Sequence, residues 1–344
     1  MDNMDQNNGA SPASAGTAKA GDAPFRWCFI GSGKLAHIVA KQILKSGRHK
    51  IVSVFTRRLA AGEAFAKEFG ARAYQSPEQA ILDPEVDGVY VVTPHTSHYT
   101  YAKCALKLGK PVLCEKPVST DTKLTEELFA IAKAKNVYFA EAMWTWFAPV
   151  AYQVQKWLSE GECGHIEKVI ANYHLNSQHY SPRVTDPNLG GGALLDIGIY
   201  PLTYLYRLFG MPVKIYCKGV LDNGIDLSEE IDLAFRNGDT YRASVSICDF
   251  RGLERFIVKG TKATIKVWFF HNAKKAVLKR ADGTRVRFKG NGDYLNEFDR
   301  VVTEIREKRT ESLFVPPQAT IDVMKIMDEC RKQMGLVYPF EKRG

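Results

Sequence analysis

Short apolar runs alternate with helix-like patterns along the first 147 residues. The apolar runs predict buried strands at 26–30, 51–55, 87–92, 112–114 and 137–140. Apolar residues three or four apart predict helices at 34–45, 60–69, 99–108 and 122–135. Strands that alternate with helices are typical of right-handed crossover units in a parallel sheet. We therefore expect an α/β fold that begins with a doubly wound parallel sheet.

The pattern changes after residue 147. A helix at 149–159, a strand at 166–172 and a helix at 194–209 precede many strand-like runs separated by turn signals such as Asn237-Gly238. These runs cover 213–220, 228–235, 240–247, 254–258, 264–268, 276–279 and 285–288, and helices at 293–308 and 318–334 follow. We expect a flexible tail at 1–24, an α/β domain at 25–147 and an α+β domain at 148–344. The second domain should hold a large, mostly antiparallel open sheet, with its last two helices free to pack back on the first domain.

Composition narrows the class of protein. Hydrophobic residues make up 45% of the chain, and no apolar run approaches the roughly 20 residues of a membrane helix. The net charge of +9 is spread out, which favours an anionic small ligand over nucleic acid. Seven scattered cysteines without a C-x-x-C pair, and a polar segment at 1–24 without an export signal, predict a cytoplasmic location. We expect no membrane and no nucleic-acid partner.

A glycine-rich turn follows the first predicted strand. Its glycines permit a tight turn and a close approach of the backbone to a pyrophosphate, and the N-terminus of the next helix favours an anion. This order of strand, glycine turn and helix predicts a dinucleotide site. The residues expected there are Gly31, Ser32, Gly33, Lys34 and Leu35.

The end of the second strand distinguishes two cofactors. An NAD site usually offers Asp or Glu here to bind the ribose 2′-hydroxyl. This strand ends instead in Thr56-Arg57-Arg58, and arginine binds phosphate through two parallel hydrogen bonds. The sequence therefore favours NADP, with NAD possible; the alternative is that the arginines only face solvent.

The fourth strand leads directly into Glu115-Lys116-Pro117. In an open parallel sheet the carboxyl ends of the strands border the crevice where ligands bind. A lysine at this place, downstream of a dinucleotide turn, is positioned to act on a substrate. Taken alone, Glu115 and Lys116 could equally form a surface ion pair.

A glycine run at 190–192 precedes a predicted helix that carries Asp196 and Tyr200. Side chains four residues apart share one face of a helix. Their carboxylate and phenol could meet Lys116 at a substrate hydroxyl, where the ammonium would lower the pKa of Tyr200 and make it a better proton acceptor. The alternative is that Asp196 caps the helix and Tyr200 packs in the core. Pro201 must lie in the first turn of this helix, since it would otherwise kink it.

Four stretches, 27–33, 115–117, 141–145 and 189–200, resemble the glucose–fructose oxidoreductase / inositol dehydrogenase family (Gfo/Idh/MocA). The similarity is strongest to its dimeric dihydrodiol dehydrogenases and NADP-dependent D-xylose dehydrogenases. It implies a Rossmann domain at 25–147, a second domain at 148–344 that binds substrate, and a homodimer or homotetramer formed through the open face of the second sheet. Because sugar-alcohol dehydrogenases of the wider family carry histidine at the position of Tyr200, the tyrosine points to the dihydrodiol subgroup.

The same resemblance implies roles for individual residues. Lys116, Tyr200 and Asp196 correspond to the family's catalytic residues. A loop after the third strand corresponds to the segment that lines the nicotinamide ribose, with His95 in place of the usual asparagine. The cofactor residues implied in this region are Thr93, Pro94, His95, His98, Glu115 and Lys116.

Candidate substrate contacts are fewer. Trp144 and Trp146 could stack on a sugar or an aromatic diol, or could pack in the core; Trp146 stands where the dihydrodiol subgroup carries arginine. His179 and Arg183, together with His174, precede the glycine run and could border the substrate or lie on the surface. The histidines have no metal-ligand spacing, so we expect no metal.

We therefore hypothesise an NAD(P)-dependent dehydrogenase or reductase acting on CH–OH groups of a sugar, a cyclic polyol or a trans-dihydrodiol. Tyr200 would take the hydroxyl proton, Lys116 would hold the hydroxyl, and Asp196 would orient the pair. Two alternatives stay open: an NAD-dependent glycosidase on the same scaffold, and a non-catalytic dinucleotide-binding regulator.

Overall fold

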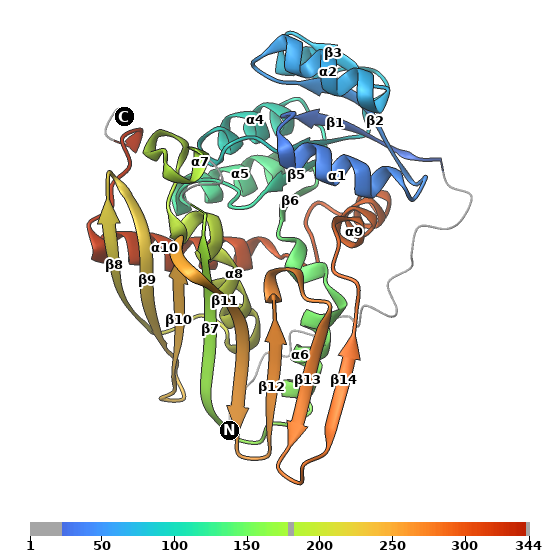
Figure 1. Cartoon of the computed structure of the whole chain (residues 1–344). Helices are drawn as coiled ribbons and strands as arrows, with labels where there is room; N and C mark the ends of the chain where they lie inside the picture. Colours follow the sequence, from blue (N-terminus) through green and yellow to red (C-terminus); the bar gives the residue numbers. More distant parts are fainter. Residues whose placement is uncertain (1–22, 178–181, 342–344) are drawn as a thin grey trace.

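The computed structural model describes residues 23–177 and 182–341 (Figure 1). Within them, a first sheet has six parallel strands in the order β3-β2-β1-β4-β5-β6. These strands are β1 (Phe25–Ile30), β2 (His49–Phe55), β3 (Arg72–Tyr74), β4 (Gly88–Val91), β5 (Val112–Glu115) and β6 (Phe139–Ala142). The order reverses between β1 and β4, which is the switch point where doubly wound sheets bind ligands. The expected doubly wound sheet is confirmed.

Helices cover both faces of the first sheet. Alternate residues of β1 face opposite sides: Trp27 packs in a core with α1 and α2, and Cys28 in a second core with α3, α4 and α5. The helices are α1 (Lys34–Leu44), α2 (Leu59–Phe69), α3 (Pro77–Ile81), α4 (His95–Lys107) and α5 (Thr122–Lys135). Burial on both faces explains why the strands read as continuous apolar runs.

The second sheet has eight strands within the described residues, in the order β14-β13-β12-β11-β7-β10-β9-β8. All its pairs are antiparallel except β7 with β10. The strands are β7 (Ile166–Asn176), β8 (Lys214–Asp222), β9 (Ile225–Ala234), β10 (Thr240–Ser246), β11 (Cys248–Gly260), β12 (Ala263–Trp268), β13 (Lys275–Arg280) and β14 (Arg285–Lys289). This confirms the expected large, mostly antiparallel sheet.

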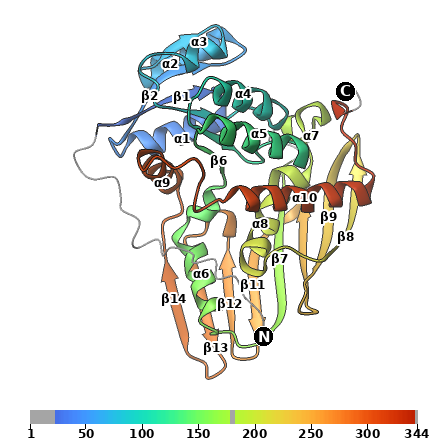
Figure 2. The ribbon, with the colours of Figure 1, turned by 180° about the vertical axis from the view of Figure 1, so that it is seen from behind.

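Helices cover one face of the second sheet (Figure 2). They are α6 (Pro149–Ser159), α8 (Ile199–Phe209) and α10 (Pro317–Met334). Figure 1 shows the opposite face, over which no helix of the described residues is drawn. The short elements are α7 (Pro182–Thr185) and the turns η1 (Trp144–Phe147), η2 (Pro187–Leu189), η3 (Leu194–Gly198) and η4 (Phe270–Asn272).

The last two helices contact the first domain. The helix α9 (Tyr294–Arg306) packs against α1, and α10 packs against α5. Phe298 of α9 meets Trp27 edge to face, with ring centroids 5.0 Å apart. The two sheets are thereby held across a shared boundary that the C-terminal helices bridge.

Three local features differ from the sequence prediction. The sequence did not predict the edge strand β3 and the helix α3, because β3 has only three residues and none of them is fully buried. The helix α4 begins at His95 instead of Tyr99, directly after Pro94. The helix expected at 194–209 is divided into a π-helical turn, η3, and α8. Pro201 lies in the first turn of α8, where its missing N–H is tolerated.

Candidate active site

The glycine turn borders a cavity of about 430 Å³ at the carboxyl ends of β1, β2 and β4. Gly31 has a φ of 117°, and a Cβ on it would collide with the carbonyl oxygen of Val92. Only glycine suits this position. A Cβ on Gly33 would meet nothing within 4 Å, so the backbone stays open to the cavity. No side chain caps the N-terminus of α1, which leaves its first amides available to an anion.

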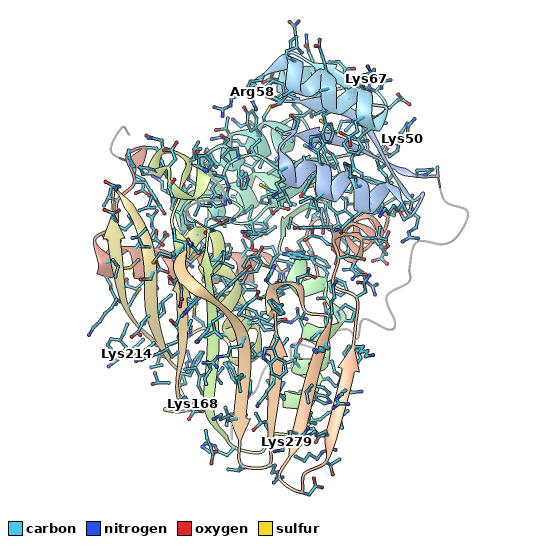
Figure 3. The ribbon with its side chains drawn as sticks, viewed as in Figure 1. Lys50, Arg58, Lys67, Lys168, Lys214 and Lys279 are labelled. Carbon is cyan, nitrogen blue, oxygen red and sulfur yellow. The ribbon has the colours of Figure 1, made fainter. Side chains whose placement is uncertain are left out.

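Thr56, Arg57 and Arg58 border the same cavity. Both arginines are exposed, and neither has an ion-pair partner within the described part of the chain. Figure 3 shows Arg58 at the end of α2 that adjoins the carboxyl end of β2. The absence of a carboxylate in the cavity lining, combined with two unpaired guanidinium groups, fits a 2′-phosphate better than a free 2′-hydroxyl.

The structure adds residues that the motif did not indicate. Phe55, Ser97 and Tyr101 also line this cavity, with the rings of Phe55 and Tyr101 5.7 Å apart. Thr93 and Pro94 line it as expected. Lys34 and Leu35 lie in the first turn of α1 but are not part of the lining.

The buried histidines His95 and His98 lie beside this cavity without lining it. The ring nitrogens of His98 are 2.7 Å from the Thr93 carbonyl oxygen and 2.8 Å from that of Pro117. The ring thereby joins the segments that follow β4 and β5. Burial lowers the pKa of His98 to about 4. This contact explains how the Lys116 segment is held, which the spacing of residues could not indicate.

Buried carboxylates lie behind Lys116. Glu115 accepts a hydrogen bond of 2.5 Å from Tyr90, and Glu141 accepts one of 3.1 Å from the amide of Val118. Burial raises the pKa of Glu115 and raises that of Glu141 to about 7. Burial also raises the pKa of Glu297 well above its ordinary value, and its oxygens have no hydrogen-bond partner within the described residues. The turn that carries Lys116 is therefore anchored to polar groups away from solvent.

A second cavity, of about 420 Å³, lies where the two domains meet and is lined by Lys116, Asp196 and Tyr200. Lys116 Nζ donates a hydrogen bond of 2.6 Å to the backbone oxygen of Asp196 and lies 3.5 Å from Asp196 Oδ1. The same Nζ sits 4.8 Å from the centroid of the Tyr200 ring. The three predicted residues thus share one cavity. They come from two segments, since Lys116 and Asp196 lie 80 residues apart in the sequence.

Asp196 is the centre of a charged network. Arg183 Nη2 donates to Asp196 Oδ1 over 2.9 Å, and Arg183 Nη1 lies 3.3 Å from His95 Nε2. Burial raises the pKa of Asp196, but the charges of Lys116 and Arg183 lower it more, so the net pKa is well below its usual value. Burial lowers the pKa of His95 well below its usual range, so a neutral ring accepts from Arg183 and donates from Nδ1 to the Gly190 oxygen, 3.2 Å away.

Tyr200 differs from the prediction. Burial raises its pKa well above the ordinary value, only partly offset by a hydrogen bond of 3.3 Å from Trp144 Nε1. The net pKa is therefore raised and not lowered as expected, because burial dominates and the carboxylates of Glu115 and Asp196 raise it further. Within the described residues the phenol oxygen accepts from Trp144 and its O–H has no acceptor. Tyr200 is therefore a neutral phenol with a free donor.

Trp144 and Trp146 occupy different environments. Trp144 lines the cavity and stacks on Tyr294, with ring centroids 4.5 Å apart and an interplanar angle of 10°. Trp146 packs away from the cavity, with the Arg207 guanidinium 4.9 Å from its ring centroid. Its expected contact with substrate is not supported, because successive residues of the short turn η1 point in different directions.

His174, which precedes the glycine run, also differs from expectation. His174 does not line the cavity: its ring nitrogens bond Asp249 and Ser244 over 3.1 Å and 2.8 Å. The neighbouring residues Tyr173 and Leu175 line it instead, because alternate residues of a strand face opposite sides. His179 lies outside the described residues.

Other lining residues were not found from the sequence. His271 and Asn272 come from the connection between β12 and β13, and Tyr294 begins α9. Ile38 and Gln42 come from α1. No local signal marks these positions, because they reach the cavity only through the packing of one domain on the other.

Two features of the described residues limit the classes of site. Among residues 23–177 and 182–341, no three His, Cys, Asp or Glu side chains are grouped so that they could hold a metal ion. Within the same ranges, no helix has the length and apolar character needed to cross a lipid bilayer.

Comparisons with known proteins agree with this geometry. Residues 25–142 match an oxidoreductase family with an NAD-binding Rossmann fold, and residues 152–266 match the GFO/IDH/MocA C-terminal domain. The chain is 31% identical over 333 residues to trans-1,2-dihydrobenzene-1,2-diol dehydrogenase of Danio rerio, covering 91% of this chain and 98% of the relative. It is 28% identical to D-xylose 1-dehydrogenase (NADP(+)) of Hypocrea jecorina, covering 92% and 93%.

A solved structure shows the same fold. A 3-ketoreductase from Actinomadura kijaniata, in complex with NADP, superposes with a TM-score of 0.82 at 20% identity, covering 90% of this chain and 98% of that chain. The resemblance expected from the four sequence stretches is confirmed by these matches. The chain therefore belongs to the GFO/IDH/MocA family of oxidoreductases with an NAD-binding Rossmann fold.

Proposed function

We propose that this protein is an NADP-dependent oxidoreductase that interconverts a C–OH and a C=O group on a sugar, a cyclic polyol or a trans-dihydrodiol. The observation that carries the proposal is the meeting of Lys116, Asp196 and Tyr200 in one cavity between the domains. The dihydrodiol and xylose dehydrogenases that resemble the chain over more than nine-tenths of its length support the substrate class.

Tyr200 is proposed as the proton-transfer residue. Bound nicotinamide supplies the hydride chemistry, and the protein has to supply or remove one proton at the substrate oxygen. Because burial keeps Tyr200 protonated and leaves its O–H free, it is prepared to donate to a carbonyl oxygen during reduction. In the oxidative direction the phenol would first release its proton to solvent, and the resulting phenolate would take the proton of the substrate hydroxyl.

Lys116 is proposed to bind the reacting oxygen. An ammonium has three N–H donors, of which two are directed at Asp196, to the backbone oxygen over 2.6 Å and to Oδ1 over 3.5 Å. The third donor can stabilise negative charge that develops on the substrate oxygen. Asp196 holds Lys116 in place, and Arg183 in turn holds the Asp196 carboxylate over 2.9 Å.

The cofactor would be held by the first domain. We assign the pyrophosphate to Gly31, Ser32 and Gly33, with the first turn of α1 at Lys34 and Leu35, because the backbone is open there. The 2′-phosphate is assigned to Thr56, Arg57 and Arg58. The nicotinamide end is assigned to the segments after β4 and β5, namely Thr93, Pro94, His95, His98, Glu115 and Lys116. We retain residues 25–147 and 148–344 as the division into domains.

The open face of the second sheet is proposed to form a homodimer or homotetramer. Tyr216 and Val220 of β8 are 56% and 57% exposed and lie on one face of the strand. We also propose a cytoplasmic location. All seven cysteines are free thiols, as expected for a reducing compartment.

A spectroscopic screen tests the proposed function. NADPH and NADH formation would be followed by fluorescence with aldoses, inositols and trans-dihydrodiols, and NADPH consumption with the matching ketones and lactones. We expect turnover of at least one compound, faster with NADP(H). Cleavage of a glycoside without net NADPH change would instead favour the glycosidase. Tight NADPH binding without any turnover would favour a regulator.

A further inference from the structure

A third cavity, of about 750 Å³, adjoins the one that holds Lys116. The two cavities share His271 and Asn272 in their linings. Figure 1 shows the connection between β12 and β13, which carries both residues, at the end of the second sheet that faces the first domain. The additional lining residues are Trp268, Phe269, Lys274 and Lys275. A substrate in the cavity that holds Lys116 could therefore extend into this one on the side where His271 and Asn272 lie.

The shared wall is rigid. Glu254 accepts hydrogen bonds from the His271 amide over 2.7 Å and pairs with His271 Nδ1 over 2.8 Å. The His271 ring also stacks on Tyr173, with centroids 5.1 Å apart and an interplanar angle of 20°. A residue fixed from both sides keeps the shared wall of the two cavities in one shape.

Asn272 has an unpaired acceptor atom in this shared wall. Its Oδ1 is buried and has no hydrogen-bond partner within the described residues. Buried polar atoms are normally hydrogen-bonded, and an exception calls for a ligand, an ion or water.

The outer part of the cavity combines aromatic rings and cations. Phe269 is 67% exposed and Trp268 is 41% exposed. Phe269 has a φ of 50°, a left-handed conformation that a bulky residue rarely adopts and that often marks a ligand site. Lys274 and Lys275 are exposed, and neither has an ion-pair partner among the residues that the structure describes.

We propose that this cavity binds the part of the substrate remote from the reacting carbon, and that this part carries an anionic group, a phosphate or a carboxylate. The two ammonium groups would bind the anion, and the aromatic faces would stack on the connecting ring. The inference rests on the proposed function. We favour substrate over a second copy of the chain as occupant, because the cavity is hollow, is lined by two lysines and shares His271 and Asn272 with the cavity that holds Lys116.

Matched neutral and anionic probes test the proposal. D-glucose, D-glucose 6-phosphate and D-glucuronate present the same C1 hydroxyl, and the latter two differ in the anion at the far end. The double variant Lys274→Gln, Lys275→Gln would be compared with Lys168→Gln, Lys279→Gln. Figure 3 shows Lys168 and Lys279 at the end of the second sheet away from the first domain. Both pairs remove two charges, so the control corrects for net charge.

We measure kcat/KM for NADPH formation and, by calorimetry, the binding of each probe to the NADP-loaded protein. We expect at least one anionic probe to exceed glucose by about ten-fold or more in kcat/KM and affinity. That preference should disappear in the Lys274, Lys275 variant and persist in the control, with glucose unchanged. Preference for only one of the two anions identifies phosphate or carboxylate as the ligand group.

Equal values for all three probes, or equal losses in both double variants, would overturn the subsite and leave the proposed function intact. If no compound is turned over at all, the proposed function fails, and calorimetry still decides whether the cavity binds the anion. Light scattering detects the competing occupant: a shift in oligomeric state in the Lys274, Lys275 variant, with unchanged anion preference, would make this face a contact between copies.

Discussion

The cofactor cavity and the substrate cavity are built in opposite ways. The first is lined by residues between Gly31 and Tyr101, all from one domain, and its arginines have no ion-pair partner within the described residues. The second is lined by residues from Ile38 to Tyr294, and its charges are already paired through Asp196. Unpaired cations in a cavity can bind an anionic ligand directly. Charges that are already paired are held in position before the substrate binds. Changes in the first should affect binding, and changes in the second should affect turnover.

Lys116→Met should have the largest effect on turnover and little effect on cofactor binding. Removing the ammonium leaves the substrate oxygen without its charge partner, so we expect kcat to fall by roughly 100-fold to 10,000-fold. The dissociation constant for NADPH, measured by fluorescence, should change little. Lys135→Met, at an exposed position near the end of α5, serves as the control. Near-native kcat in the Lys116 variant would contradict the proposed role.

Replacing Arg57 and Arg58 together by alanine should have the converse effect. Loss of charge-assisted hydrogen bonds to a 2′-phosphate should weaken NADPH binding by about 10-fold to 100-fold, while NADH binding stays the same. The matched control is Lys67→Ala, at the other end of α2 (Figure 3). If NADPH and NADH lose affinity equally, the arginines do not read the 2′-phosphate.

These two cavities also differ in how far sequence could predict them. Gly31 and Gly33 can be found from the sequence because a strand, a tight turn and a helix follow each other directly. Arg57 can be found because it follows the end of the second strand. The meeting of Lys116, Asp196 and Tyr200 is predicted from a strand end and a helical spacing, and the family resemblance adds the catalytic roles. The predicted pKa direction of Tyr200 is wrong, because burial raises the pKa and that burial depends on packing between domains. His271, which has no local motif, could not have been found.

Glu141 links the substrate cavity to folding. Burial raises its pKa to about 7, above the value of 4.5 expected when unfolded. Between those values the folded state holds a proton that the unfolded state has lost, so this group makes the free energy of unfolding decrease as pH rises through that window. Glu141→Gln should reduce the decrease by about 1 kcal/mol per pH unit. Urea titrations from pH 4.5 to 8 measure this.

The exposed Glu63 provides a control for that series. Glu63→Gln should leave the pH dependence of the unfolding free energy unchanged, because its carboxylate gains little from folding. If Glu141→Gln also leaves it unchanged, the carboxyl is not held in its protonated form and the anchoring of the Lys116 turn has a different electrostatic basis.

The smallest effects should distinguish Trp144 from Trp146, two residues apart in one short turn. Trp144→Phe keeps the stacking on Tyr294 but removes the 3.3 Å hydrogen bond to the Tyr200 oxygen. Because a neutral hydrogen bond contributes about 1 kcal/mol, kcat/KM should fall about five-fold. Trp146→Phe removes a buried Nε1 that has no partner within the described residues, so stability should hold or rise and kcat/KM should stay constant. Equal losses of kcat/KM in the two variants would show that Trp146 also contributes to the substrate cavity.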